Sequence, residues 1–202
     1  MFLSLTLICV GVAIALAGVN RLTEEPIRKA KKEQLKNAIR EVVPEFDNDP
    51  DEEAYWATAG AGDSLKVYPA KREGQWVGTA VETFSMNGFS GEIKLIVGFD
   101  SQGKIINYAV LQHAETPGLG DKMGKWFKID AHRQNILGKN LSAGTLKVSK
   151  DGGEVDAITA ATITSRAFLE AINRAYTAFL GAELSDGASG ATENDGVSGA
   201  TE

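Results

Sequence analysis

The sequence is poor in the residues that support several common functions. It contains one cysteine, Cys9, so no disulfide can form within the chain. Its two histidines, His113 and His132, show no metal-ligand spacing with cysteine or clustered carboxylates, and no metal site is expected. Acidic residues outnumber basic ones 27 to 21, which gives a net charge of −6. Without a basic surface to pair with phosphates, nucleic acid is not an expected partner.

Charge is absent from residues 1–20, which read MFLSLTLICVGVAIALAGVN. At ~1.5 Å per helical residue, this run is just long enough to cross a hydrocarbon layer of ~30 Å. We therefore predict a transmembrane anchor in residues 1–20. A cleaved signal peptide is the alternative, since Ala15–Ala17 resembles a cleavage site, but no positively charged segment precedes the run. The missing basic flank suggests a start other than the numbered one.

A charged helical pattern continues from Arg21 without a break, with Thr23 suited to cap a helix and Pro44 to stop it. We assign residues 21–44 to a juxtamembrane helix. Basic residues follow the span closely, at positions 21, 28, 29, 31 and 32. By the positive-inside rule they would place the following domain in the cytoplasm. The acidic, turn-rich residues 44–60 are predicted to form a solvated loop, because they lack the spacing of a calcium-binding EF-hand.

Residues 64–71 and 74–85 have the apolar patterning of strands, with the Glu73-Gly74 pair as the turn between them. The clearest element is a β-hairpin over residues 93–111: Ile93, Leu95 and Val97 alternate with polar or small residues, DSQG forms the turn, and residues 105–111 return. Residues 145–149 are a candidate for another short strand. An amphipathic helix from Ile163 to Leu180, ended by Gly181, follows. The prediction is an α+β domain over residues 45–182, an antiparallel sheet with helices at its margins.

The final residues, 183–202, are rich in Gly, Ser, Asp and Glu and contain almost no apolar side chains. Such a segment buries too little surface to offset its ordering entropy, so we expect a disordered acidic tail. The tail is also a near-repeat, because DGASGATEN is followed by DGVSGATE.

Four hydroxyl side chains lie within residues 159–165, at the entry to the last predicted helix. One N-cap needs fewer hydroxyls than this. A helix N-terminus offers free N–H groups and a partial positive charge, which suit a phosphate, and the small Ala160 and Ala161 leave room for a bulky group. The alternative is a threonine N-cap followed by small residues that pack in the core.

Three stretches carry a resemblance to a known family. Residues 156–162, DAITAAT, resemble the acceptor motif for covalent FMN, although Ala160 stands where glycine is common. Residues 88–105 are similar to the core hairpin of the FMN-binding family, and residues 113–123 to its flavin-side loop. With the N-terminal anchor, the chain resembles the G subunits of Rnf ion-translocating electron-transport complexes. The C subunits of the sodium-translocating NADH:quinone oxidoreductases are the near alternative.

The resemblance implies that an ApbE-type flavin transferase, which recognises Asp156, attaches FMN to Thr162 through its phosphate. It also implies contacts to the cofactor from a wider set: Ser90, Glu115, Thr116, Gly118, Leu119, Lys122, Thr159, Ala161, Ile163 and Thr164. On composition alone, the Pro117-Gly118 pair is an ordinary surface turn and Ser90 belongs to a hairpin entry. Trp126 and Phe127 are expected in the core rather than against the flavin.

The tail contains two further matches to the acceptor motif, which end at Thr192 and Thr201. Neither is followed by an apolar helix that would supply a docking site. They are either additional flavin acceptors or a low-complexity duplication. We expect Thr162 to hold the functional FMN and the tail positions to be empty or partly occupied.

The function that the resemblance implies is that of a single-pass electron carrier in the cell inner membrane, with its soluble domain on the periplasmic side. This orientation contradicts the charge count after the span. The chain would be an oxidoreductase only as part of a complex, with no catalytic residue of its own, and its partners would be the other Rnf subunits, the transferase and the membrane. A membrane-tethered scaffold without cofactor is the alternative. A free-standing flavin reductase would need a nicotinamide site, and the sequence contains no GxGxxG fingerprint.

Overall fold

The computed structural model describes residues 2–60 and 62–189 of the chain. By internal contacts the chain divides into two units, residues 1–37 and 38–202. Helix α1, Phe2–Val42, crosses this boundary as one continuous helix.

The first unit consists of the helical residues before Ala38. By length and composition α1 is able to cross a membrane, and its most apolar window has a mean hydropathy of 2.5. The prediction that Thr23 caps a new helix is wrong. Its hydroxyl donates to the carbonyl of Val19 at 2.9 Å, one turn earlier in the same helix. Pro26 lies inside the helix without ending it.

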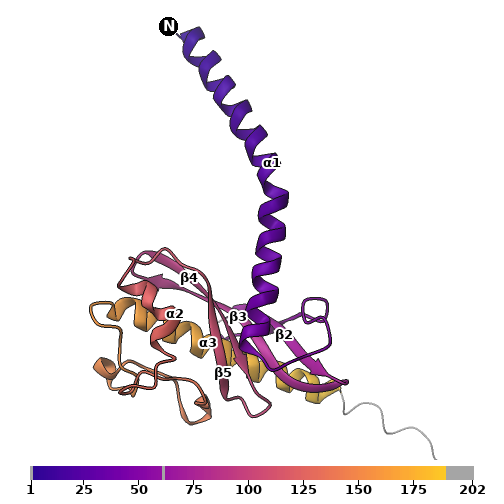
Figure 1. The fold of residues 1–202 in the computed structure, drawn as a ribbon, viewed down its shortest axis with the longest axis vertical. Coiled ribbons are helices and arrows are strands. Elements are labelled where there is room, and N and C mark those ends of the chain that lie inside the picture. Colours follow the sequence, from indigo (N-terminus) through magenta and orange to yellow (C-terminus); the bar gives the residue numbers. More distant parts are fainter. Residues whose placement is uncertain (1, 61, 190–202) are drawn as a thin grey trace, which may run out of the picture. The chain divides into compact units, whose positions relative to one another are not determined.

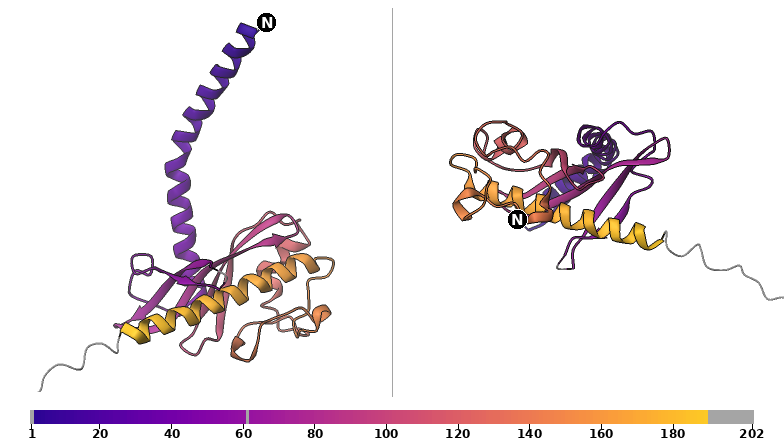
Figure 2. Two further views of the ribbon diagram at one scale, coloured as in Figure 1. Left: turned by 180° about the vertical axis from the view of Figure 1, so that it is seen from behind. Right: turned by 90° about the horizontal axis from the view of Figure 1, so that it is seen from below.

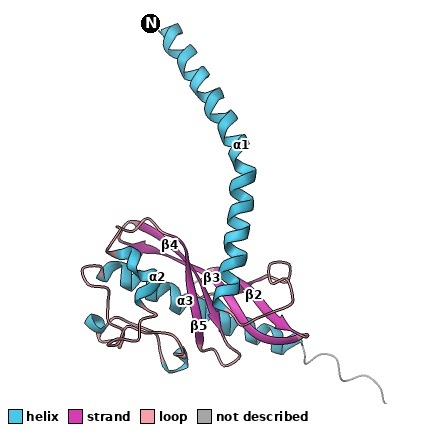
Figure 3. Cartoon of the chain, viewed as in Figure 1, coloured by secondary structure: helices cyan, strands magenta, loops and turns pink. Residues whose placement is uncertain are grey.

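The second unit contains one five-stranded antiparallel sheet in the order β1-β2-β3-β4-β5, so each strand pairs with its sequence neighbour (Figure 1). The strands are β1 (Tyr55–Thr58), β2 (Ser64–Arg72), β3 (Gln75–Gly88), β4 (Gly91–Phe99) and β5 (Ile105–Gln112). Figure 3 shows the sheet together with the helices of the domain, and the predicted α+β class is confirmed.

Two hairpins follow the sequence prediction. Between β2 and β3, Glu73 and Gly74 both adopt positive φ, 53° and 75°, as a tight two-residue hairpin turn requires. Between β4 and β5, the carboxylate of Asp100 accepts the backbone N–H groups of Gln102 and Lys104, each at 2.8 Å. The hairpin predicted over residues 93–111 is therefore confirmed.

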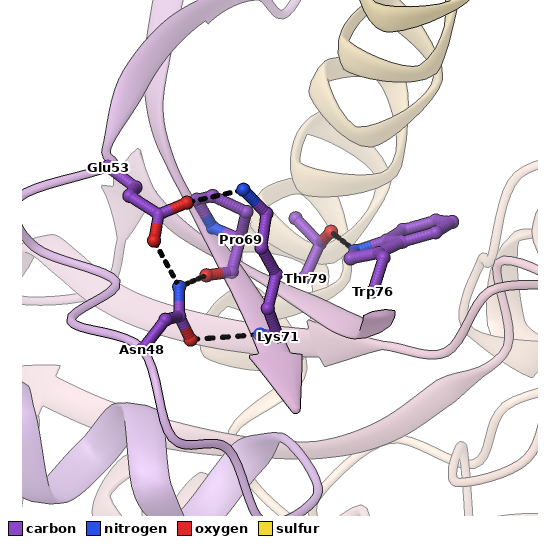
Figure 4. Close-up of polar contacts among 6 residues, drawn as sticks. All are labelled: Asn48, Glu53, Pro69, Lys71, Trp76 and Thr79. Atoms are coloured by element: carbon purple, nitrogen blue, oxygen red, sulfur yellow. Dashed lines mark hydrogen bonds and ion pairs between the residues drawn. The ribbon is translucent and has the colours of Figure 1, made fainter. Parts of the chain in front are cut away.

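Strand β1 was not expected, because residues 44–60 were predicted to be loop. The segment that precedes it is tied to β2, as Figure 4 shows. Asn48 accepts the N–H of Lys71 at 2.9 Å and donates to the carbonyl of Pro69 at 2.9 Å. Glu53 pairs with the Lys71 ammonium. These long-range bonds hold the acidic segment against the edge of the sheet.

Helix α3, Thr162–Ser189, covers one face of the sheet (Figure 2). Apolar side chains at alternate positions of β4 are buried between the two: Ile93, Leu95, Val97 and Phe99. Phe168 of α3 stacks on Phe127, with ring centroids 4.4 Å apart, and meets Tyr108 edge-on at 4.9 Å. Phe127 is thus a core residue, as predicted.

The C-terminal end of α1, where Ala38, Ile39 and Val42 are buried, touches the opposite face of the sheet. A side chain at Gly98 of β4 would overlap the carbonyl of Val42, so this glycine permits direct contact between helix and strand. Asn107 of β5 donates to the carbonyl of Glu41 at 2.9 Å.

The prediction that Gly181 ends the last helix is wrong, since α3 continues through Ser189. A Cβ at position 181 would lie 3.1 Å from the carbonyl oxygen of Thr58, so the glycine allows α3 to pass close to β1. The expected tail therefore overlaps the helix in residues 183–189. Residues 190–202, with Thr192 and Thr201, lie outside the described part of the chain.

The remaining elements are short: η1 (Gly120–Lys122), α2 (Met123–Trp126), η2 (Leu141–Ala143) and η3 (Ser149–Asp151). The candidate strand at residues 145–149 does not form. Val148 instead makes an isolated parallel bridge to Val155, and η3 begins at the next residue.

Candidate functional site

A cavity of about 320 Å³ opens where three segments of the second unit meet. The segments are the turn between β3 and β4, the loop before η1 and the start of α3. Its lining residues are Phe89, Glu115, Thr116, Leu119, Gly120, Ala160, Ala161, Thr162, Ile163 and Thr164. A volume of this size is in the range of small-molecule sites.

The start of α3 is stabilised by two hydrogen bonds of one side chain, the Ser165 hydroxyl. The hydroxyl of Ser165 accepts the N–H of Ile158 at 2.9 Å and donates to the carbonyl of Ala161 at 2.9 Å. The first N–H groups of a helix have no acceptor within the helix, and they carry its partial positive charge. Ala161, Thr162, Ile163 and Thr164 therefore bring an anion-binding terminus to the wall of the cavity.

Ala160, just before this helix, adopts a left-handed conformation with φ of 62°. Glycine adopts this conformation without the steric cost that a Cβ imposes. This geometry gives a physical reason for the glycine that is common at this position of the acceptor motif.

Thr162 is the first residue of α3, and its side chain is half-buried at the cavity. Its hydroxyl oxygen lies 3.3 Å from the ammonium of Lys150, which reaches it from η3. The resemblance implied that Lys122 contacts the cofactor, but Lys122 is not among the cavity-lining residues. Lys150 was missed because it lies outside the three stretches that carry the resemblance.

Glu115 joins the three segments that form the cavity, and its side chain is only 5% exposed. Its Oε2 accepts the hydroxyl hydrogen of Thr164 at 2.6 Å, while its Oε1 accepts the backbone N–H of Ser90 at 3.0 Å. Ser90 thus supports the wall through its backbone and does not line the cavity.

Two glycines give this carboxylate room. A Cβ at Gly120 would lie 2.5 Å from Glu115 Oε2 and 2.8 Å from Thr164 Oγ1. A Cβ at Gly88 would lie 2.8 Å from Glu115 Oε1. Both positions must stay without a side chain if the loop, the hairpin turn and α3 are to meet at one carboxylate.

The cavity also has apolar walls that are open to solvent. Phe89 is 67% exposed, Ile163 48% and Leu119 39%. Leu119 and Ile163 were among the predicted residues, and Phe89 was not. Exposed apolar side chains around a cavity are typical of a surface that contacts a ligand or a partner.

The other predicted residues lie in several places. Thr116 lines the cavity, whereas Thr159 is exposed and does not. Gly118 adopts φ of 77°, as a turn residue does, and no atom lies within 4 Å of the position that a Cβ would occupy. The Trp126 indole is half-buried and donates to the carbonyl of Asp156 at 3.0 Å.

Asp156 lies outside the cavity lining and stabilises the loop before α3. Its carboxylate forms an ion pair with Arg133 at 3.5 Å. A hydrogen bond from the Ser149 side chain holds the pKa of this carboxyl below its usual value, with a smaller contribution from Arg133. The ionised side chain therefore links two loops, and recognition of Asp156 by a transferase stays a prediction.

The fold and the cavity fit an FMN-binding domain, and residues 88–177 match the family model of that description. Three curated relatives are each named as the G subunit of an ion-translocating oxidoreductase complex. The protein from Stutzerimonas stutzeri is 37% identical over 86% of this chain and 77% of its own length. That from Yersinia pestis is 36% identical over 86% of each. That from Vibrio cholerae El Tor is 38% identical over 76% of this chain and 77% of its own.

The chain belongs to the family of G subunits of ion-translocating oxidoreductase complexes. The resemblance seen in the sequence is thus confirmed. Among solved structures, the crystal structure of Shewanella oneidensis NqrC matches with a TM-score of 0.47 and 21% identity, over 73% of this chain and 70% of that one.

Proposed function

We propose that this chain is a membrane-anchored electron carrier of an ion-translocating oxidoreductase complex, with FMN held covalently through a phosphodiester to Thr162. One observation carries the proposal: the Thr162 hydroxyl lies at a cavity, at a helix N-terminus and 3.3 Å from a lysine ammonium. A phosphate ester placed there would meet both the helix dipole and a side-chain cation. The described residues therefore fit the phosphate end of FMN.

The flavin end would lie between the apolar walls. Phe89, Leu119 and Ile163 provide exposed apolar surface beside the acceptor hydroxyl. Bound FMN would supply the redox chemistry, since it accepts and releases electrons. The protein's part is to tether the cofactor, orient it and set its electrostatic surroundings, and the buried Glu115 lines the same cavity.

No side chain need act as nucleophile or general base during turnover. The protein would take part in catalysis as one member of a complex. Its partners would be the other integral and peripheral Rnf subunits, with a flavin transferase of the ApbE type acting once during maturation. The three curated relatives described above, each named as a G subunit, favour an Rnf-type complex over a quinone reductase.

Membrane attachment would be through α1, whose apolar part is long enough to cross a bilayer. We place the soluble domain on the periplasmic side of the inner membrane. A carrier on that side has no access to cytosolic FMN, so a covalent bond would prevent its permanent loss. Labelling of an engineered cysteine in the domain by an impermeant reagent tests the orientation, and labelling only after lysis of the inner membrane would contradict it.

The attachment itself is tested by co-producing the chain with a flavin transferase. We expect a yellow protein that fluoresces in a denaturing gel under ultraviolet light, because a covalent flavin survives denaturation. Thr162→Ala should abolish the fluorescence that comes from flavin attached to residue 162. Thr159→Ala is the matched control, since Thr159 is exposed and does not line the cavity. A colourless wild-type protein would favour the alternative, a cofactor-free scaffold.

A further inference from the structure

Lys150 is held in a fixed position beside α3, although its side chain is exposed. It is the middle residue of η3, Ser149–Asp151, and Gly152 at the end of this turn adopts φ of 79°. Ser149 donates its N–H to the carbonyl of Val155 at 2.8 Å, which closes the loop on itself. A side chain at Gly153 would overlap the backbone of Lys147, so the return of the chain is tightly packed.

The neighbouring residue attaches this turn to α3. Both carboxylate oxygens of Asp151 accept hydrogen bonds from the Arg166 guanidinium, each at 2.7 Å. This two-point contact fixes the orientation of both groups. Arg166 lies one turn after Thr162, so the bond sets the position of Lys150 relative to the acceptor hydroxyl.

Both carboxylate oxygens of Asp151 are therefore occupied by the ion pair with Arg166. The Arg166 hydrogen bonds hold the pKa of Asp151 below its usual value, so this carboxylate is ionised and paired. Within residues 2–60 and 62–189, Lys150 forms no ion pair, and its one polar side-chain contact is the Thr162 hydroxyl at 3.3 Å. A lysine ammonium beside a neutral hydroxyl is suited to pair with a negative charge that is introduced when this hydroxyl is modified.

We propose that Lys150 is a positioning residue for the flavin phosphate: its ammonium pairs with the negative charge of the phosphodiester on Thr162. The inference rests on the proposed attachment of FMN to Thr162 and goes beyond it, because it assigns the residue that compensates the new charge. In the modified protein, the hydroxyl oxygen of Thr162 becomes the ester oxygen and is bonded to the phosphorus. The charged non-bridging oxygens are bonded to the same phosphorus, so the Lys150 ammonium is within reach of them. Such charge-assisted hydrogen bonds are stronger than neutral ones.

The test is a thermodynamic cycle on the full-length protein in detergent. Melting temperatures are measured for flavin-loaded and flavin-free wild type, Lys150→Gln, Lys150→Arg and Lys104→Gln. Lys104 is an exposed lysine in the β4–β5 turn, so its replacement changes the net charge equally but removes no contact with Thr162. Flavin-free samples are made without the transferase, and loading is verified by intact mass.

We expect Lys150→Gln to lose roughly 2–4 °C of the stabilisation that loading gives the wild type, the shift expected for one such bond in a chain of this size. Lys150→Arg and Lys104→Gln should keep the wild-type increment. High salt should reduce the increment of the wild type more than that of Lys150→Gln. Failure of Lys150→Gln to load while Lys150→Arg loads would also support the assignment.

Equal increments in all four proteins would overturn the role of Lys150 while leaving attachment to Thr162 intact. The same conclusion would follow if both Lys150 variants fold but neither is loaded, because charge would then not be the property required. A wild-type protein that carries no flavin would instead contradict the proposed function itself.

Discussion

The Thr164 hydroxyl donates a hydrogen bond of 2.6 Å to Glu115 Oε2, although the two residues are 49 positions apart in the chain. The Thr164 side chain is 1% exposed and that of Glu115 5% exposed, so water does not substitute for this bond. It connects the loop before η1 to the first turn of α3 and thereby closes one wall of the cavity.

Thr164→Val keeps the shape of the side chain but leaves a buried carboxylate oxygen without its donor. We expect the free energy of unfolding to fall by about 1–3 kcal/mol, the cost of an unsatisfied buried polar group. Urea unfolding followed by circular dichroism measures it. Thr177→Val is the matched control, because its hydroxyl donates only to Asn173 of its own helix and is exposed. Equal losses in the two variants would contradict the structural role of the Glu115 contact.

Gly120→Ala should disturb the same contact from the other side. The added methyl would lie 2.5 Å from Glu115 Oε2, and overpacking of this kind costs about 1–3 kcal/mol. Gly124→Ala in α2 is the control, since the nearest atom to its Cβ is 4.0 Å away. We expect unfolding measurements to show a loss for Gly120→Ala and little change for Gly124→Ala. If Gly120→Ala is as stable as the wild type, the packing of the loop on α3 differs from that described.

Ala160→Gly should stabilise the protein, or leave its stability unchanged, rather than weaken it. The left-handed conformation at residue 160 costs an L-residue about 1–2 kcal/mol, and the greater flexibility of glycine in the unfolded chain offsets part of the gain. Ala175→Gly, in the buried middle of α3, should lose about 1 kcal/mol or more. Thermal unfolding of both variants provides the comparison, and a clear loss for Ala160→Gly would argue against the left-handed geometry.

Stability should decrease in alkaline solution because of two buried tyrosines. Burial raises the pKa of Tyr68 and of Tyr108 in the folded protein. Above about pH 10 the unfolded chain loses these protons and the folded chain keeps them, so the free energy of unfolding falls as pH rises. Below that pH both states are protonated and the contribution is complete. Tyr68→Phe/Tyr108→Phe should show a shallower decline between about pH 9 and 11 in urea titrations, and an unchanged slope would contradict this assignment.

The sequence was most informative where local patterns determine structure. Alternation of apolar residues predicted the hairpin over residues 93–111, and the uncharged run predicted a helix long enough to span a membrane. The end of the last helix was misjudged at Gly181, because a glycine usually marks a helix end. Here it allows close approach to β1, a contact that no local pattern shows.

The site itself was predictable only in part. The hydroxyl-rich entry to α3 and the glycine-rich loop were recognised, and the structure brings Thr162, Leu119 and Glu115 to one cavity. The proximity of Lys150 depends on the Asp151–Arg166 contact, and the central position of Glu115 depends on bonds across long sequence separations. A single sequence contains no signal for such tertiary contacts.

Attachment of FMN to Thr162 is tested by peptide mass mapping of the full chain co-produced with a flavin transferase. Wild type, Thr162→Ala and the double variant Thr192→Ala/Thr201→Ala are compared, since the tail also contains two acceptor-like motifs. We expect a flavin-phosphate adduct on the peptide that contains Thr162, retained in the double variant and lost from that peptide in Thr162→Ala. An unmodified Thr162 peptide in the wild type, whether or not the tail carries flavin, would contradict it.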